Sequence, residues 1–184
     1  MVNEIAYNKA KLLAEKIHLL QTRAGTGIPY VTHPIAVSEI LIKYGRSEEE
    51  VIAGVLHDVV EDMDGTEEEV ENLKREIARD FGTAVLSIVL GATKISKKED
   101  GNRLTRVKID IYHYVMGSAG VHNVKIADTM HNLSDLSTLD PAFAKKYLRE
   151  KEWLVAEFAK NGKADKQMLA DLQAQIEVLK SQFQ

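Results

Sequence analysis

The sequence has no cysteine among its 184 residues. This absence excludes disulfides, thiol nucleophiles and zinc sites built from thiolates. Only three prolines occur, each where a helix can begin or a loop can turn. No uninterrupted apolar stretch approaches the roughly 20 residues that span a bilayer. We therefore expect no membrane partner.

Basic residues are in the minority, with 24 lysines and arginines against 28 acidic residues, which gives a formal net charge of −4. A nucleic-acid backbone is therefore not an expected partner. A small anionic substrate stays open, because the charge around a site can oppose the net charge. The N-terminal residues Met1 to Glu4 show no basic region followed by an apolar run, which predicts a cytoplasmic location without a signal peptide.

Apolar residues recur at helical spacing along the whole chain, and no segment shows the sustained alternation typical of strands. Residues 3–20 place Ile5, Leu12, Leu13, Ile17 and Leu20 at this spacing. Two capping boxes, Ser47 with Glu50 and Thr66 with Glu69, mark helix starts. Further predicted helices begin at Pro34 and cover 83–94, 103–116, 121–136, 141–160 and the last segment, with a polar loop at 94–102. The pattern predicts an all-α helical bundle with one domain over 1–184, in which 163–184 is a C-terminal packing helix.

The most informative feature is the pair His57-Asp58, which lies in the apolar stretch 55–60. Burial of adjacent imidazole and carboxylate groups costs free energy unless something binds them. Glu61 and Asp62 follow one helical turn later, so we expect four titratable groups on one stripe of a single helix. Such a stripe indicates a metal site with acid–base groups beside it, in preference to a surface salt-bridging face.

Two further residues complete the predicted ligand set. His33 precedes Pro34, a position from which a side chain at a helix start can point into a cleft. Asp128 lies among apolar residues of another predicted helix, so its burial requires a partner, which a metal would supply. The set is two imidazoles and two carboxylates: His33, His57, Asp58 and Asp128. This mixture suits manganese, iron or magnesium better than structural zinc, and it leaves about two octahedral positions for water and a substrate oxygen.

Three segments in this order resemble the HD hydrolase domain of RelA/SpoT proteins: 30–34 (YVTHP), 56–62 (LHDVVED) and 124–133 (VKIADTMHNL). The short length and the sequence GSAG at 117–120 make the chain most similar to the stand-alone small alarmone hydrolases of the metazoan SpoT type. The resemblance covers roughly residues 5–155. It implies a single HD domain that hydrolyses the 3′-pyrophosphate of ppGpp or pppGpp, giving GDP or GTP and pyrophosphate.

The resemblance also implies roles for individual residues. The predicted ligand set falls where the family binds its metal, usually Mn²⁺, and we expect one ion per chain. Glu61 and Asp62 fall on the pair that positions and deprotonates the attacking water. Asn132 falls on the residue that contacts the ribose of the nucleotide substrate, and Arg23 falls near the arginine that packs against the nucleobase.

Two positions leave alternatives open. Ala24 follows Arg23 where the family often has lysine, and the loop is one residue longer, which leaves the choice between guanine and adenine open. The basic group expected before the third segment is either Arg103 or Arg106, and we favour Arg103, since arginine suits bidentate phosphate contacts. Alternative functions are another HD-family nucleotide phosphohydrolase, such as a nucleotidase, and a non-catalytic helical binding module.

Other features have simpler explanations. The remaining histidines are expected to lie on the surface or to serve packing: His18, His113, His122 and His131. An apolar stripe in the last segment is expected to pack on the domain, and it leaves homo-oligomerisation open: Leu169, Leu172, Ile176, Leu179 and Phe183.

Overall fold

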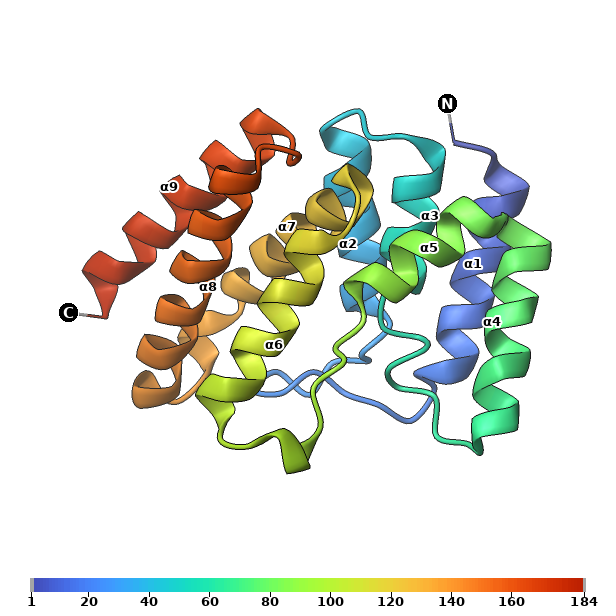
Figure 1. Ribbon diagram of the computed structural model, residues 1–184, viewed down its shortest axis with the longest axis horizontal. Helices are drawn as coiled ribbons and strands as arrows, with labels where there is room; N and C mark the ends of the chain where they lie inside the picture. Colours follow the sequence, from blue (N-terminus) through green and yellow to red (C-terminus); the bar gives the residue numbers. More distant parts are fainter. Residues whose placement is uncertain (1, 184) are drawn as a thin grey trace.

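The computed structural model describes residues 2–183, which form nine α-helices, two short 3-10 helices and no β-strand (Figure 1). The α-helices are α1 (Glu4–Ile17), α2 (Thr32–Lys43), α3 (Glu48–Leu56), α4 (Glu67–Phe81), α5 (Thr83–Ala92), α6 (Arg103–Met116), α7 (Ala119–Ser134), α8 (Pro141–Asn161) and α9 (Lys166–Gln182). The 3-10 helices are η1 (Lys98–Asp100) and η2 (Leu136–Thr138). The predicted all-α class is confirmed.

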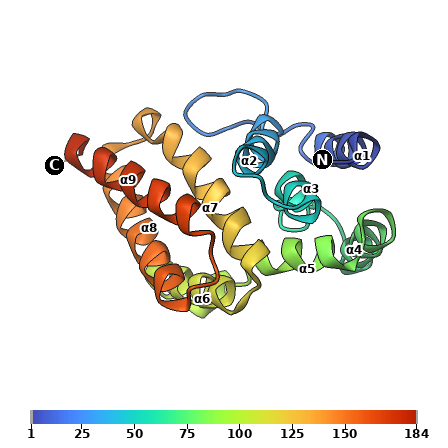
Figure 2. The same ribbon diagram turned by 90° about the horizontal axis from the view of Figure 1, so that it is seen from above.

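Helix α7 lies in the middle of the bundle. Figure 2 shows α2, α3 and α5 on one side of it and α8 and α9 on the other, and α7 packs against α2, α3, α5 and α9. Every residue from Val121 to Thr129 is buried. A helix that is enclosed on all sides must find partners for each of its polar side chains. The polar groups of α7 therefore meet residues that α2 and α3 bring to it.

The two predicted capping boxes and the predicted helix start at residue 141 are confirmed. The Ser47 hydroxyl accepts a hydrogen bond from the Glu50 amide, while the Glu50 carboxylate accepts one from the Ser47 amide. Thr66 and Glu69 form the same reciprocal box at the start of α4. Asp140 caps α8 through the Phe143 amide. These caps satisfy backbone donors that no residue inside a helix can reach.

The first helix differs from the prediction in its length and in the face that it buries. It ends at Ile17, and Ile5, Leu12 and Leu20 are exposed. The buried face is formed by the predicted Leu13 together with Ala10 and Ala14. These positions follow the spacing i, i+3, i+4, and the alanines allow α1 to pack against α3. Ile5, Leu12 and Leu20 lie off this stripe, so side-chain size alone was a misleading guide.

Helix α9 follows the predicted C-terminal segment. It buries Met168, Leu172 and Ile176, and it packs against α7 and α8. Met1 and Gln184 lie outside the described residues, so the domain bounds 1–184 stay a prediction. No helix in the part of the chain from 2 to 183 combines the length and apolar character needed to cross a membrane.

The contact between α2 and α3 depends on a glycine. A β-carbon at Gly54 would lie 2.5 Å from Leu41 Cδ1 and 3.4 Å from Ser38 Cα. Leu41 and Ser38 are both fully buried, so neither can move into solvent. The same two helices carry or end at His33 and His57. The separation of the two imidazoles is therefore tied to the absence of a side chain at Gly54.

We expect Gly54→Val to separate α2 from α3. Overpacking of a filled core costs about 1–3 kcal/mol, so the urea midpoint should fall, and the affinity for a divalent metal should fall with it. Ala159→Val, at an exposed position of α8, is the control for the β-branched side chain. An unchanged midpoint and an unchanged metal affinity in the Gly54 variant would contradict this account.

Candidate active site

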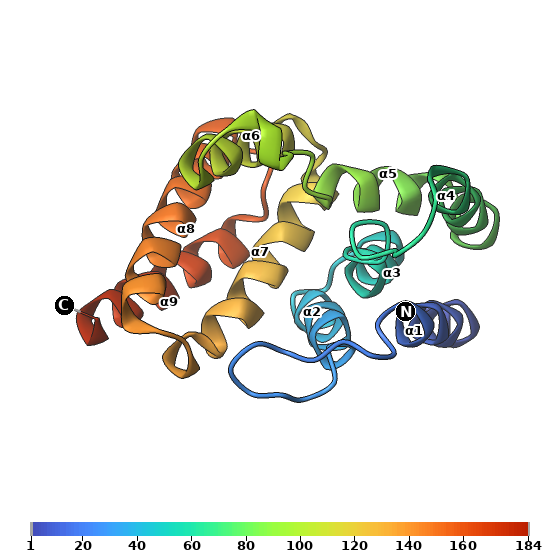
Figure 3. The same cartoon turned by 90° about the horizontal axis from the view of Figure 1, so that it is seen from below.

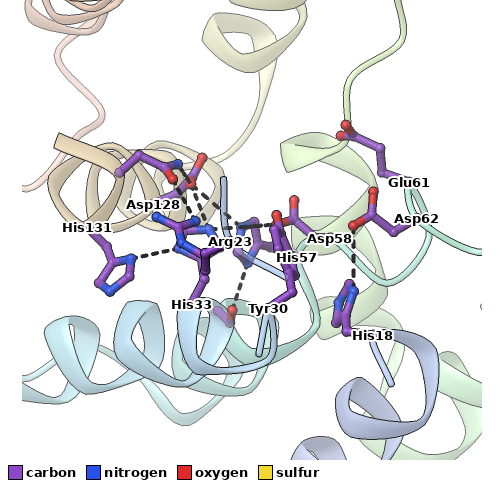
Figure 4. Close-up of polar contacts among 12 residues, drawn as sticks. His18, Arg23, Tyr30, His33, His57, Asp58, Glu61, Asp62, Asp128 and His131 are labelled. Carbon is purple, nitrogen blue, oxygen red and sulfur yellow. Dashed lines mark hydrogen bonds and ion pairs between the residues drawn. The ribbon is translucent and has the colours of Figure 1, made fainter. Parts of the chain in front are cut away.

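The four predicted ligands come together between α2, α3 and α7 (Figure 4). One ligand atom each from His33, His57 and Asp58 lies within 4.8 Å of the others. Asp128 Oδ1 is 3.2 Å from His33 Nε2 and 3.8 Å from His57 Nε2. We call these four residues the ligand cluster. It joins side chains that are 95 positions apart in the sequence (128 − 33).

The backbone fixes which nitrogen His57 presents to the cluster. Its Nδ1 donates to the carbonyl of Gly54 over 2.9 Å, and a carbonyl can only accept. A neutral His57 ring therefore carries its lone pair on Nε2. This Nε2 lies 3.1 Å from Asp58 Oδ2, is buried, and has no hydrogen-bond partner among the described residues.

This arrangement fits a divalent cation. A lone pair on His57 Nε2 faces carboxylate oxygens of Asp58 and Asp128, and mutually facing acceptors repel one another unless a positive charge lies between them. Burial lowers the pKa of His57, but the two carboxylates outweigh burial and raise the pKa to about 10. The field that attracts a proton to this point also attracts a metal ion. The oxygen and imidazole donors suit Mn²⁺, Fe²⁺ or Mg²⁺.

Hydrogen bonds from neighbouring residues keep the carboxylates charged and oriented. The Tyr30 hydroxyl donates to Asp58 Oδ2 over 2.6 Å, and Lys125 Nζ donates to Asp128 Oδ2 over 2.6 Å. Burial raises the pKa of Asp128, but the Lys125 ammonium and the imidazoles outweigh it and hold the pKa well below its usual range. Metal ligation requires ionised carboxylates, and these partners provide that state.

His33 is oriented by a second histidine. His33 Nδ1 lies 2.8 Å from His131 Nδ1, so one ring donates to the other. Burial lowers the pKa of His33, and burial lowers that of His131 to about 4 with help from His33 and Arg23. A neutral His33 that donates from Nδ1 presents the lone pair of Nε2 to the ligand cluster.

The predicted single helical stripe is wrong. Helix α3 ends at Leu56, and His57 is its C-cap residue. The Val59 amide bonds to the Leu56 carbonyl, which is a tighter i to i+3 turn, and the Asp62 amide bonds to the Asp58 carbonyl. The pair His57-Asp58 therefore lies where α3 unwinds. This position frees the two side chains to point into the cluster.

Glu61 and Asp62 follow on this turn, beside Asp58 (Figure 4). Glu61 accepts hydrogen bonds from the backbone amide and the ammonium group of Lys94. Asp62 Oδ2 lies 3.5 Å from Nδ1 of the buried His18. Burial, Asp58 and Glu61 raise the pKa of Asp62. A carboxylate with a raised pKa is a better proton acceptor, since its conjugate acid is weaker.

Arg23 and Asn132 lie on the other side of Asp128. Arg23 donates to Asn132 Oδ1 over 3.0 Å and to Asp135 Oδ2 over 2.8 Å. The Asn132 amide nitrogen donates to Asp128 Oδ1, and the Arg23 guanidinium lies 5.9 Å from the centre of the Tyr30 ring. The two residues predicted to contact the nucleoside are thus bonded to each other and placed next to the ligand cluster.

The loop that carries Arg23 is held by an isolated bridge between Thr22 and Pro29. Gly25 has a φ of +82°, a left-handed conformation that favours glycine, and a β-carbon there would lie 2.5 Å from Thr138 Oγ1. The glycine allows the loop to approach η2 closely. This approach places Arg23 against the end of α7.

Arg103, the favoured phosphate-binding residue, is engaged elsewhere. Its guanidinium donates to both carboxylate oxygens of Glu150 on α8, over 2.6 and 2.8 Å. The other candidate, Arg106, has a buried Nε without a hydrogen-bond partner among the described residues. The structure therefore does not bring Arg103 into the ligand cluster, because a bidentate salt bridge holds it against α8.

Sequence reasoning missed several residues that border the site: His18, Tyr30, Lys94, Lys125 and His131. The contact of Lys125 with Asp128 could have been predicted from the sequence, because Lys125 precedes Asp128 by three residues and so lies on the same helix face. His18 is buried, as expected of a packing histidine, and it also lies beside Asp62, while His131 bonds to the ligand His33. Their contacts come from elements distant in sequence.

The family model described as HD domain matches residues 10–162. The chain belongs to the HD domain family. This match includes the whole ligand cluster, and the three segments that suggested the RelA/SpoT resemblance lie inside it.

Curated relatives share the same region. A probable guanosine-3′,5′-bis(diphosphate) 3′-pyrophosphohydrolase from Synechocystis is 34% identical over 154 residues, which are 82% of this chain and 19% of the relative. The bifunctional (p)ppGpp synthase/hydrolase SpoT of Escherichia coli is 32% identical over 145 residues, 77% of this chain and 20% of the relative. The chain spans about a fifth of the length of these relatives.

Solved structures confirm the fold. A metazoan orthologue of SpoT that hydrolyses ppGpp superposes with a TM-score of 0.79, at 22% identity, over 96% of this chain and 97% of that chain. A protein from Listeria monocytogenes gives a TM-score of 0.57, at 22% identity, over 79% of this chain and 96% of the other. The predicted single HD-type bundle is therefore the observed architecture.

We expect His57→Ala and Asp128→Asn each to abolish stoichiometric Mn²⁺ binding. Either change removes one donor and leaves the opposing buried groups without their cation, so the stability of the metal-loaded protein should also fall. Isothermal titration calorimetry and thermal unfolding with and without Mn²⁺ measure both effects. Glu68→Gln, on the exposed first turn of α4, is the control for a lost carboxylate. Wild-type stoichiometry and affinity in either ligand variant would refute the ligand assignment.

Proposed function

We propose that the chain is a metal-dependent hydrolase of (p)ppGpp-like alarmones, with one Mn²⁺ per chain, that releases the 3′-pyrophosphate and leaves GDP or GTP. The observation that carries this proposal is the order of groups around the ligand cluster. Arg23 and Asn132 lie on one side of Asp128, and Glu61 and Asp62 lie beside Asp58. A nucleoside site, a metal site and a proton acceptor are thus contiguous. The names of the curated relatives agree with this chemistry.

The ligands His33, His57, Asp58 and Asp128 would hold the ion. When bound, the ion supplies charge to the phosphoryl oxygens and lowers the pKa of a coordinated water. Side chains of the protein orient the water and accept its proton. Asp62 accepts the proton of the attacking water, which its raised pKa favours. Glu61 is held by Lys94 and orients the water beside Asp62.

The nucleoside is held by the pair Arg23 and Asn132. The guanidinium plane beside Tyr30 offers a stacking surface for a base, and the Asn132 amide offers a donor and an acceptor for ribose hydroxyls. Hydrolysis adds water across the bond between phosphorus and the ribose 3′ oxygen. The 3′ oxygen leaves with a proton, and pyrophosphate retains the oxygen of the water.

The role of Glu61 can be separated from that of the ligands. We expect Glu61→Gln to keep the metal, because Glu61 bonds to Lys94 and to no member of the ligand cluster. Turnover should nevertheless fall by roughly 10²-fold or more, if the carboxylate orients or deprotonates water. Metal content is measured by elemental analysis and turnover by product formation. Matched metal content with unchanged turnover would remove Glu61 from the mechanism.

The decisive experiment is product analysis. Mn²⁺-loaded protein incubated with ppGpp should give GDP and pyrophosphate, with no orthophosphate in the first turnover. The adenine analogue should be tested in parallel, because the loop after Arg23 lacks the lysine that the family often has. Guanine accepts and adenine donates at the 6-position, so a fixed partner would discriminate strongly, whereas a stacking arginine alone would not. Anion-exchange chromatography separates the products.

Two outcomes of this assay would overturn the proposal. Orthophosphate released from 5′-monophosphates, with ppGpp left intact, would favour a nucleotidase. The absence of hydrolysis of every nucleotide by fully loaded protein would favour a non-catalytic binding module. Comparable rates with the guanine and adenine substrates would leave the alarmone chemistry in place and assign the base contact to stacking.

A further inference from the structure

Three lysines interact with carboxylates of the site: Lys125 bonds to Asp128, Lys94 bonds to Glu61, and the charge of Asp128 acts on Lys151. Lys125 precedes Asp128 by three residues on α7, whereas Asn132 follows it by four, so the two lie in opposite directions along the helix axis. Lys94 follows α5. Lys151 lies on α8, which runs alongside α6 on the far side of α7 (Figure 3). The three lysines thus come from α7, from α8 and from the segment after α5.

Two of these ammonium groups are already neutralised. Lys125 forms an ion pair with Asp128, and Lys94 forms one with Glu61. The ammonium group of Lys151 forms no ion pair or hydrogen bond with any other described residue, and it lies 4.6 Å from the centre of the Tyr147 ring. An aromatic face is a weak partner for an ammonium group compared with a carboxylate. Lys151 is therefore the one lysine of the three whose charge is uncommitted.

The charges of the site act on Lys151. Burial lowers its pKa to about 8, Lys125 and Lys94 act in the same direction, and Asp128 and Glu150 oppose them. A lysine that is desolvated and surrounded by other cations gains from an incoming anion, since each negative oxygen replaces lost hydration.

Both acidic neighbours of Lys151 in sequence are paired with other residues, Glu152 with Lys180 and Glu150 with Arg103. Glu150 directs both carboxylate oxygens to Arg103, which also lies 5.1 Å from the centre of the Phe143 ring. This bidentate salt bridge fixes Glu150 toward α6. The residue predicted to bind phosphate thus keeps a carboxylate away from the lysine.

We propose that Lys151 binds the diphosphate group that the enzyme releases, and that Arg103 is a positioning residue that acts by holding Glu150. This inference rests on the proposed function. A nucleoside at Arg23 and Asn132 and a reacting phosphorus at the ligand cluster place the rest of the diphosphate further along α7, toward Lys125. There Lys151 provides the positive charge that the paired lysines do not.

The first test measures substrate kinetics and diphosphate binding in Lys151→Ala, Lys151→Arg and the control Lys160→Ala, which changes an exposed lysine of the same helix. Lys151→Ala loses one charged hydrogen bond to the diphosphate, so we expect KM for ppGpp and Kd for inorganic pyrophosphate to rise by roughly tenfold. Lys151→Arg should recover most of both, and Mn²⁺ affinity and guanosine affinity should stay at the wild-type values in all variants.

Calorimetry with inorganic pyrophosphate and Mn²⁺-loaded protein keeps the two proposals apart, because it requires no turnover. If ppGpp is not hydrolysed, the alarmone proposal fails while the effect of Lys151 on pyrophosphate binding is still measured. Wild-type pyrophosphate affinity in Lys151→Ala overturns the assignment. An equal loss of guanosine and pyrophosphate affinity also overturns it, since that result indicates a general disturbance of the fold.

The second test asks whether Arg103 acts by holding Glu150 or by contacting phosphate directly. In Arg103→Ala, Glu150 is free to pair with Lys151, so pyrophosphate affinity should fall. The double variant Arg103→Ala/Glu150→Gln removes the competing carboxylate and should recover the wild-type affinity. If the double variant stays as weak as the single one, Arg103 itself contacts phosphate and its positioning role is wrong.

Discussion

The structure depends on one electrostatic constraint, the burial of two carboxylates and two imidazoles against one another in a helical core. Asp58 and Asp128 are enclosed by apolar helices, and each costs several kcal/mol of desolvation unless positive charge lies within contact distance. Lys125 and Tyr30 donate hydrogen bonds to the two carboxylates, and the Gly54 carbonyl orients the His57 ring. With these partners in place, the position between His57 Nε2 and the oxygens of Asp58 and Asp128 suits a cation. The close contact of α2 with α3 at Gly54 and the enclosure of α7 bring these groups together.

Charge is distributed along α7 in a direction that matches the proposed substrate. The end nearest Arg23 offers neutral hydrogen-bonding groups and a planar cation, which suit a nucleoside. The other end gathers ammonium groups from α7, α8 and the segment after α5, which suit phosphates. A chain with a net charge of −4 thus keeps one ammonium group, that of Lys151, without a carboxylate partner at this end. The net charge led us to expect no long polyanion as a partner, and it left a small anionic substrate open.

The sequence was sufficient for the fold class, for the helix starts at Ser47, Thr66 and Asp140, and for the grouping of the four ligands. Capping boxes are local, so adjacent residues contain the whole signal. The buried face of α1 was predicted only in part, because two of its three buried residues are alanines, Ala10 and Ala14, which a search for large apolar residues does not find. The salt bridge of Arg103 with Glu150 was not predicted, because Glu150 lies 47 positions away on another helix. Contacts of this kind depend on tertiary geometry, which residue spacing does not contain.

The placement of Lys125, Asp128, His131 and Asn132 on one buried helix also limits how such proteins can vary in length. Each residue inserted or deleted within α7 would rotate everything after it by about 100°. A single deletion before Asp128 would turn Asp128, His131 and Asn132 away from their partners together, so all three contacts would be lost in one step. Length changes are tolerable only in the exposed segments between helices, such as the polar stretch around η1. Insertions that adapt this scaffold to new substrates are therefore confined to loops, while α7 can change only by substitution.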